Sequence, residues 1–66
     1  MDEGAIIKAA RHRLRLSVRE MAVHVFEVWG YGKGPANPRT IRYWESGKQD
    51  IPAPVLEAAR AVIEAD

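Results

Sequence analysis

Ser17-Val18-Arg19-Glu20 is the stretch of sequence that decides the fold, because it marks a helix start with two reciprocal signals. In this S-x-x-E spacing the serine oxygen accepts from an unpaired N–H of the first turn, and the glutamate accepts from the serine N–H. The apolar residues that follow recur at helical spacing; they are Val18, Met21, Ala22, Val25, Phe26 and Trp29. The pattern predicts an amphipathic helix that stops by Gly30.

Helical signals also lie on both sides of this segment. Residues 3–14 place apolar side chains on one side at helical spacing, and a short third helix is predicted from Asn37, its N-cap, to Gly47, its C-cap. A last helix runs to about Ala65, and no alternating strand pattern occurs. The expected fold is all-α: a single domain over residues 1–66, built as a compact bundle of four or five short helices.

A glycine-rich segment separates the second predicted helix from the third. Three glycines and a proline in the seven residues 30–36 exclude a helix there and predict a loop. The loop, together with Trp29, covers about residues 29–36.

Composition excludes several classes of site and location. The 66 residues include no cysteine, so neither a disulfide nor a thiolate metal site is possible. No apolar run is long enough to span a membrane, and the acidic start is unlike a signal peptide, so a cytoplasmic protein is expected.

The net charge of +1 hides an asymmetry: residues 1–3 carry −2, residues 4–49 carry +6 and residues 50–66 carry −3.

The third predicted helix has two different faces. At 100° per residue, Ile41, Trp44 and Glu45 fall on one side. The other side presents Arg39, Arg42, Tyr43 and Ser46. Arginine is well suited to binding guanine O6 and N7 in the major groove with two hydrogen bonds.

Two motifs in this chain resemble the Cro/C1-type helix-turn-helix family of phage and bacterial repressors. They are Arg11-x-x-Leu14-x-Leu16-Ser17-x-x-Glu20-Met21-Ala22 and Thr40-Ile41-Arg42-Tyr43-Trp44-Glu45-Ser46-Gly47-Lys48. The resemblance covers about residues 6–63. The Tyr-Trp-Glu-Ser-Gly ending and the small size are also similar to the anti-CRISPR-associated autorepressors of phage and mobile elements. The chain departs from the family in its turn, which is longer by about nine residues; this glycine-rich insertion falls at about residues 29–36.

The resemblance implies a double-stranded DNA-binding transcription regulator, a small dimeric repressor or autorepressor. Its helix-turn-helix would cover about residues 17–47, with helix 38–46 reading the major groove of a palindromic operator. Base readout is expected from Arg39, Arg42 and Tyr43, and Arg11 and Glu45 match an internal ion pair. The expected phosphate contacts are Ser17, Arg19, Asn37, Thr40 and Lys48. Lys33, on the glycine-rich loop, is a further phosphate candidate; the alternative is a surface insertion that touches nothing.

Apolar residues on the last predicted helix cover an arc wider than one packing face needs. Part of this arc closes the core. The remainder is expected to pair with a second copy of the chain, in a homodimer that suits palindromic half-sites. The expected dimer residues are Val55, Ala58, Val62 and Ala65.

Other functions remain open. Residues 40–45 are also similar to the MerR-type winged helix and its excisionase-like relatives, although Lys48-Gln49-Asp50 replaces the aliphatic pair that starts the wing there. A different class is an antitoxin-like module that binds another protein, which an exposed Trp29 or Tyr31 would favour. An enzyme is not expected, since no catalytic or metal-ligand spacing occurs, and neither a cofactor nor a small-molecule ligand is indicated.

Overall fold

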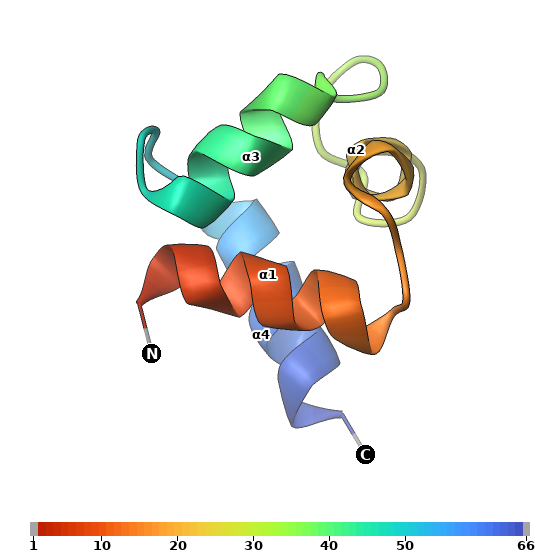
Figure 1. Ribbon diagram of the computed structural model, residues 1–66. Coiled ribbons are helices and arrows are strands. Elements are labelled where there is room, and N and C mark those ends of the chain that lie inside the picture. The colour runs from red at the N-terminus through yellow and green to blue at the C-terminus, as the bar shows by residue number, and fades with distance from the viewer. Residues whose placement is uncertain (1, 66) are drawn as a thin grey trace.

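The computed structural model describes residues 2–65 as four helices with no strand among them. They are α1 (Glu3–Arg13), α2 (Val18–Glu27), α3 (Pro38–Ser46) and α4 (Ala53–Glu64). Helix α1 packs against both α3 and α4, and α2 packs against α3. In Figure 1, α3 lies across the view while α2 is seen end-on, so these two helices cross steeply. The predicted all-α bundle is confirmed, with four helices rather than five.

Capping explains where the helices begin. The Ser17 side chain accepts from the Glu20 N–H at 3.1 Å, and the Glu20 carboxylate accepts from the Ser17 N–H at 2.9 Å, so the predicted capping box is complete. Asn37 caps α3 by accepting from the Arg39 N–H at 2.9 Å. Gly47, with a φ of 80°, ends α3 in the left-handed conformation that glycine adopts without strain.

One hydrophobic core joins all four helices. Trp44, on α3, is its largest side chain and is 2% exposed. The other buried apolar residues come from each helix in turn: Ile6, Ile7 and Ala10; Met21, Ala22 and Val25; Ile41; Val55 and Ala59. The stripes predicted for α1 and α2 are therefore the ones that supply the core.

The α1–α3 crossing depends on a glycine. A Cβ atom at Gly4 would lie 2.5 Å from the Glu45 carbonyl oxygen and 2.8 Å from that of Trp44. Both obstacles are backbone atoms, which cannot move aside as a side-chain tip can. The absence of a side chain at Gly4 thus lets the first turn of α1 approach the last turn of α3.

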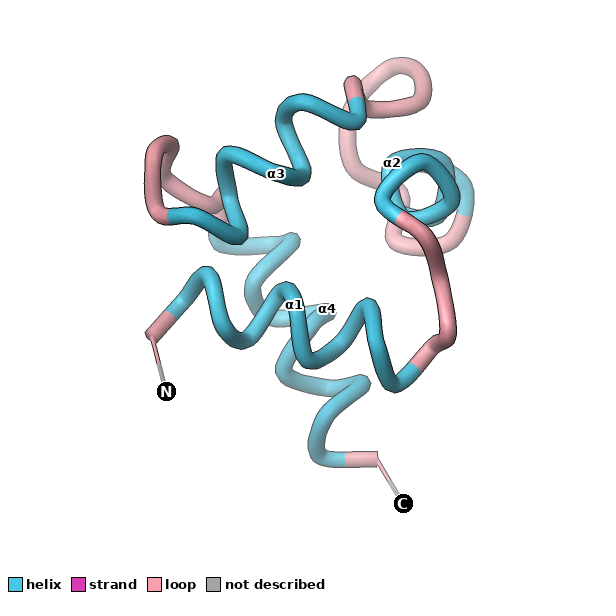
Figure 2. The backbone as a smooth tube through the Cα atoms, in the orientation of Figure 1, coloured by secondary structure: helices cyan, strands magenta, loops and turns pink. Residues whose placement is uncertain are grey.

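The connection between α2 and α3, residues 28–37, folds back along α2 (Figure 2). The Tyr31 N–H donates to the Val25 carbonyl and the Ala36 N–H donates to the Ala22 carbonyl, each at 3.1 Å. The Tyr31 and Trp44 rings also meet in a T-shaped arrangement, with centroids 6.3 Å apart. The predicted loop is therefore confirmed, and both its beginning and its end are attached to α2.

One predicted dimer residue is wrong. Val55 is 0% exposed and belongs to the core, so it cannot contact a second copy. The other three differ in exposure: Ala58 and Val62 are half-buried, and Ala65 is exposed just beyond the end of α4 at Glu64. Val55 and Ala59 use part of the apolar arc of α4 for the core. The part of the arc that is left for a second copy is therefore narrower than predicted.

Within residues 2–65, no helix has both the length and the apolar character that crossing a membrane requires.

Candidate nucleic-acid interface

Helix α3 separates a buried side from an exposed one. Ile41 and Trp44 are anchored in the core, whereas Arg39 and Arg42 are exposed. Tyr43 is half-buried, and the Lys48 Nζ lies over its ring, 5.3 Å from the centroid. Two guanidinium groups and a phenol are thus displayed on a helix whose other side is fixed by packing.

A bidentate ion pair fixes α3 against α1. Arg11 Nε donates to Glu45 Oε2 at 2.7 Å, and Arg11 Nη2 donates to Oε1 at 3.1 Å. Arg11 Nη1 also donates to the Leu16 carbonyl at 3.1 Å, so the same guanidinium holds the entry to α2. The Arg11 and Glu45 side chains are 14% and 12% exposed, which shields the pair from solvent screening. The hydrogen bond to Glu45 raises the pKa of Arg11 above its ordinary value. The predicted structural pair is confirmed.

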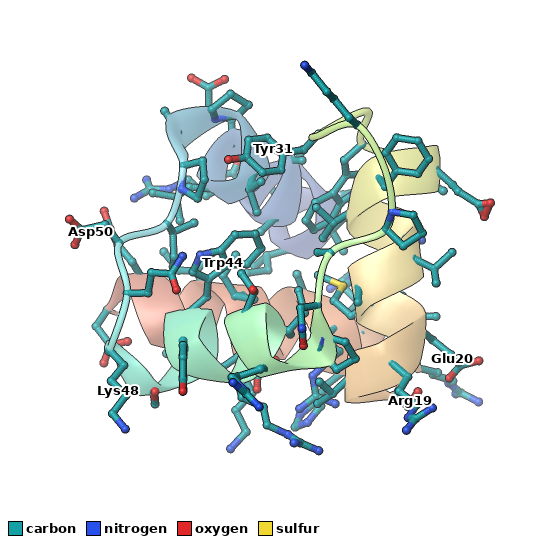
Figure 3. All side chains as sticks on the ribbon, turned by 90° about the horizontal axis from the view of Figure 1, so that it is seen from above. Arg19, Glu20, Tyr31, Trp44, Lys48 and Asp50 are labelled. Carbon is teal, nitrogen blue, oxygen red and sulfur yellow. The ribbon has the colours of Figure 1, made fainter. Side chains whose placement is uncertain are left out.

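The start of α2 lies beside α3 on one edge of the molecule. Figure 3 shows Arg19 and Lys48 along the same edge, on either side of α3, which runs between them. Arg19 is exposed in the first turn of α2, and Lys48 is exposed just after α3. We call this edge the basic face and define it by Arg19, Arg39, Arg42 and Lys48.

The remaining predicted phosphate contacts have structural roles as well. Ser17 and Asn37 are the N-caps of α2 and α3, and each uses a side-chain oxygen to accept a backbone N–H. The serine hydroxyl proton and the asparagine amide N–H groups remain available as donors. Thr40, in the first turn of α3, is half-buried.

The glycine-rich loop faces elsewhere. Tyr31 packs on Trp44, a residue on the buried side of α3. In Figure 3, Tyr31 accordingly lies at the edge opposite Arg19 and Lys48. Lys33 is exposed on this loop, and its predicted phosphate contact gains no support from the position of Tyr31.

The surface formed by residues 2–65 has no pocket, and no group of three or more histidines and carboxylates there could hold a metal ion. His24 meets the Trp29 ring edge-on, with centroids 5.4 Å apart. One buried polar atom stands out: the Trp44 Nε1 has no hydrogen-bond partner in the described structure. It donates to nothing and faces the core side of α3, so it gives α3 no chemistry toward the basic face.

Two residues of structural importance were not singled out from the sequence. Gly4 was missed because a glycine in the first turn of a helix resembles an ordinary helix start, and only the crossing with α3 reveals its role. Arg15 was missed because its left-handed backbone, with a φ of 58°, is one that sequence rules assign to glycine. The hydrophobic Leu16 that follows it is the one local signal for the turn.

Comparison of the chain with models of protein families, with curated proteins and with solved structures found no match to any of them.

Proposed function

We propose that the protein is a sequence-specific double-stranded DNA-binding transcription regulator that inserts α3 into the major groove. The observation that carries this proposal is the exposure of Arg39 and Arg42 on a rigidly held helix. Neither side chain forms a hydrogen bond or ion pair within residues 2–65, so both are free to bind. Their backbone is fixed by Ile41 and Trp44 in the core and by the Arg11–Glu45 pair.

Chemistry assigns different roles to the residues of this face. Arg39 and Arg42 would read guanine O6 and N7 with two hydrogen bonds each, a contact that discriminates by about 1–3 kcal/mol per base pair. Tyr43 would bind a phosphate or contact a thymine methyl group. Because Lys48 lies over its ring, Tyr43 is held in place before DNA arrives.

Phosphate contacts would fix the position of α3 in the groove. Arg19 and Lys48 are separated by α3 on the basic face, so each could reach a different part of the DNA backbone. The N-terminus of α2 adds backbone N–H groups and the Ser17 hydroxyl, which favour an anion. The +6 charge of residues 4–49 supports this placement, whereas the acidic segment 50–66 includes α4, which packs on α1.

Selection of bound duplexes from random DNA tests the proposal. We expect an enriched motif, and we expect Arg39→Ala and Arg42→Ala each to lose about 1–3 kcal/mol of binding at that motif and to relax specificity at one position. Arg60→Ala removes the same charge from exposed α4 and is the matched control, expected to bind as wild type. No enrichment of any sequence would refute sequence-specific recognition, and an equal loss on all sequences would make the arginines phosphate contacts.

The proposed regulator acts as a homodimer in the cytoplasm of a bacterial or phage-infected cell. Ala58 and Val62 on α4, together with Ala65 just beyond its end, form the surface that we assign to the second copy. Palindromic half-sites about one DNA turn apart would follow from its two-fold symmetry. With no pocket for an effector among residues 2–65, autorepression through its own concentration is the simplest control. Sedimentation of wild type and Val62→Lys checks the assembly, because a lysine in the seam should leave a monomer.

A protein-binding module is the second candidate, and exposed apolar residues favour it. Val28 is 65% exposed, Val23 is 41% exposed and Tyr31 is 37% exposed, all on or after α2. A DNA-independent complex of fixed stoichiometry would support this function, provided that Val28→Ser weakens it. The winged-helix alternative gains no support, because residues 48–52 lead directly into α4 and form no strand.

A further inference from the structure

Helix α1 ends in a Schellman motif, in which a left-handed residue closes the last turn. The Leu16 N–H donates to the Arg11 carbonyl at 3.1 Å, and the Arg15 N–H donates to the His12 carbonyl at 3.0 Å. Arg15 is the left-handed residue, and its φ of 58° is the one positive φ of a non-glycine residue within 2–65.

The same chain uses glycine for the same task elsewhere. At the end of α3, the Lys48 N–H donates to the Tyr43 carbonyl at 2.9 Å and the Gly47 N–H donates to the Trp44 carbonyl at 3.3 Å. This is the same motif with Gly47 at the left-handed position. Glycine has no Cβ to clash with the following carbonyl, whereas arginine does, so Arg15 destabilises its turn relative to a glycine.

The Arg15 side chain does nothing within the described chain to offset this strain. The Arg15 side chain is exposed and forms no hydrogen bond, ion pair or ring contact with any of residues 2–65. Arg11, four residues earlier, shows the contrast, since its guanidinium is used by Glu45 and Leu16. Backbone strain at a residue whose side chain has no internal partner points to a role in binding.

The position of Arg15 identifies the binding partner. It lies in the connection between α1 and α2, whose course Figure 1 shows, and this connection enters α2 at its N-terminal end. Arg15 stands two residues before Ser17, the N-cap of α2, and four residues before Arg19, which is part of the basic face.

We propose that Arg15 contacts a phosphate of double-stranded DNA and that its left-handed backbone is kept for this contact at the expense of stability. This inference rests on the proposed DNA-binding function. It extends the basic face to the α1–α2 connection and assigns Arg15 to backbone binding rather than to base readout, because it lies outside α3.

The decisive variant is Arg15→Gly, since stability and binding should move in opposite directions. Relief of the strained turn should raise the Tm by about 4 °C. Binding to a mixed-sequence duplex of about 20 base pairs should weaken. The negative slope of log K against log salt should become less steep, by about 0.9 for each Arg15 removed from a phosphate. Arg15→Lys should keep the slope.

Arg60→Ala is the control, because it removes the same charge from α4. An unchanged salt slope in Arg15→Gly, with wild type binding the duplex and Arg39→Ala losing affinity at the selected motif, would overturn the role of Arg15 and leave the proposed function standing. A slope that falls equally in Arg15→Gly and Arg60→Ala would also overturn it, since only net charge would then matter. If wild type binds no duplex at any salt concentration, the proposed function itself fails.

Discussion

Substitution of Gly4 by alanine should destabilise the protein, although helix propensity alone predicts the opposite. Replacing glycine with alanine inside a helix gains up to about 1 kcal/mol. The new Cβ, however, would lie 2.5 Å from the Glu45 carbonyl oxygen, and at least 0.5 Å of backbone movement is needed to reach the 3.0 Å that real Cβ atoms respect. Overpacking of this kind costs about 1–3 kcal/mol. The net loss should be about 1–2 kcal/mol, out of a total stability of roughly 3–10 kcal/mol for a chain of this size.

Urea unfolding followed by circular dichroism measures this loss, and a fall in Tm of about 4–8 °C per kcal/mol should accompany it. Gly34→Ala is the matched control, because nothing lies within 4 Å of its new Cβ and its φ is not in the left-handed region. That variant should change stability by less than about 0.5 kcal/mol. A Gly4→Ala protein as stable as wild type, or more stable, would refute the close α1–α3 crossing.

Three further predictions concern the scaffold. A double-mutant cycle on Arg11→Met and Glu45→Gln, measured by denaturant unfolding, should give a coupling energy of about 1–3 kcal/mol; a value near zero would show that the pair does not hold α3. Hydrogen bonds from Ser17 lower the pKa of Glu20, so its stabilisation is present above the unfolded pKa of 4.5 and disappears as the pH falls through the folded value. The stability difference between wild type and Glu20→Gln should therefore shrink from pH 7 to pH 3; a constant difference would contradict this. Trp44→Ala creates a cavity and should lower the free energy of unfolding by about 3–5 kcal/mol. Trp44→Phe should lose about 1–2 kcal/mol less than this, because phenylalanine keeps most of the packing and removes an indole N–H that has no partner.

Local patterns predicted most of the fold. The S-x-x-E spacing at Ser17 and the Asn37-Pro38 start both appear as the expected caps, because a cap depends on residues within one helical turn. The Arg11–Glu45 pair was expected from the resemblance to a repressor family and is present. It joins residues 34 positions apart, so periodicity alone could not have found it.

Contacts between helices explain what the sequence could not predict. Val55 and Val62 share the apolar arc of α4, and only the packing of α4 on α1 shows that Val55 is the fully buried one. The fold of the glycine-rich loop likewise depends on Tyr31 meeting Trp44, a contact between an irregular segment and a helix. Of the predicted site residues, Arg39 and Arg42 are exposed together on one helix, and their role in DNA binding is the proposal that the selection experiment tests.

The attachment of the α2–α3 connection to α2 makes the length of this connection independent of the angle at which α2 and α3 cross. In a plain turn, the length of the turn and the crossing angle would depend on each other. Because the Tyr31 and Ala36 amides both bond to α2, the ends of residues 32–35 are held in place whatever lies between them. Lengthening that short segment would add little loop-closure entropy and would leave the α2–α3 crossing untouched. Residues 32–35 can therefore gain or lose residues while the geometry of the basic face stays constant.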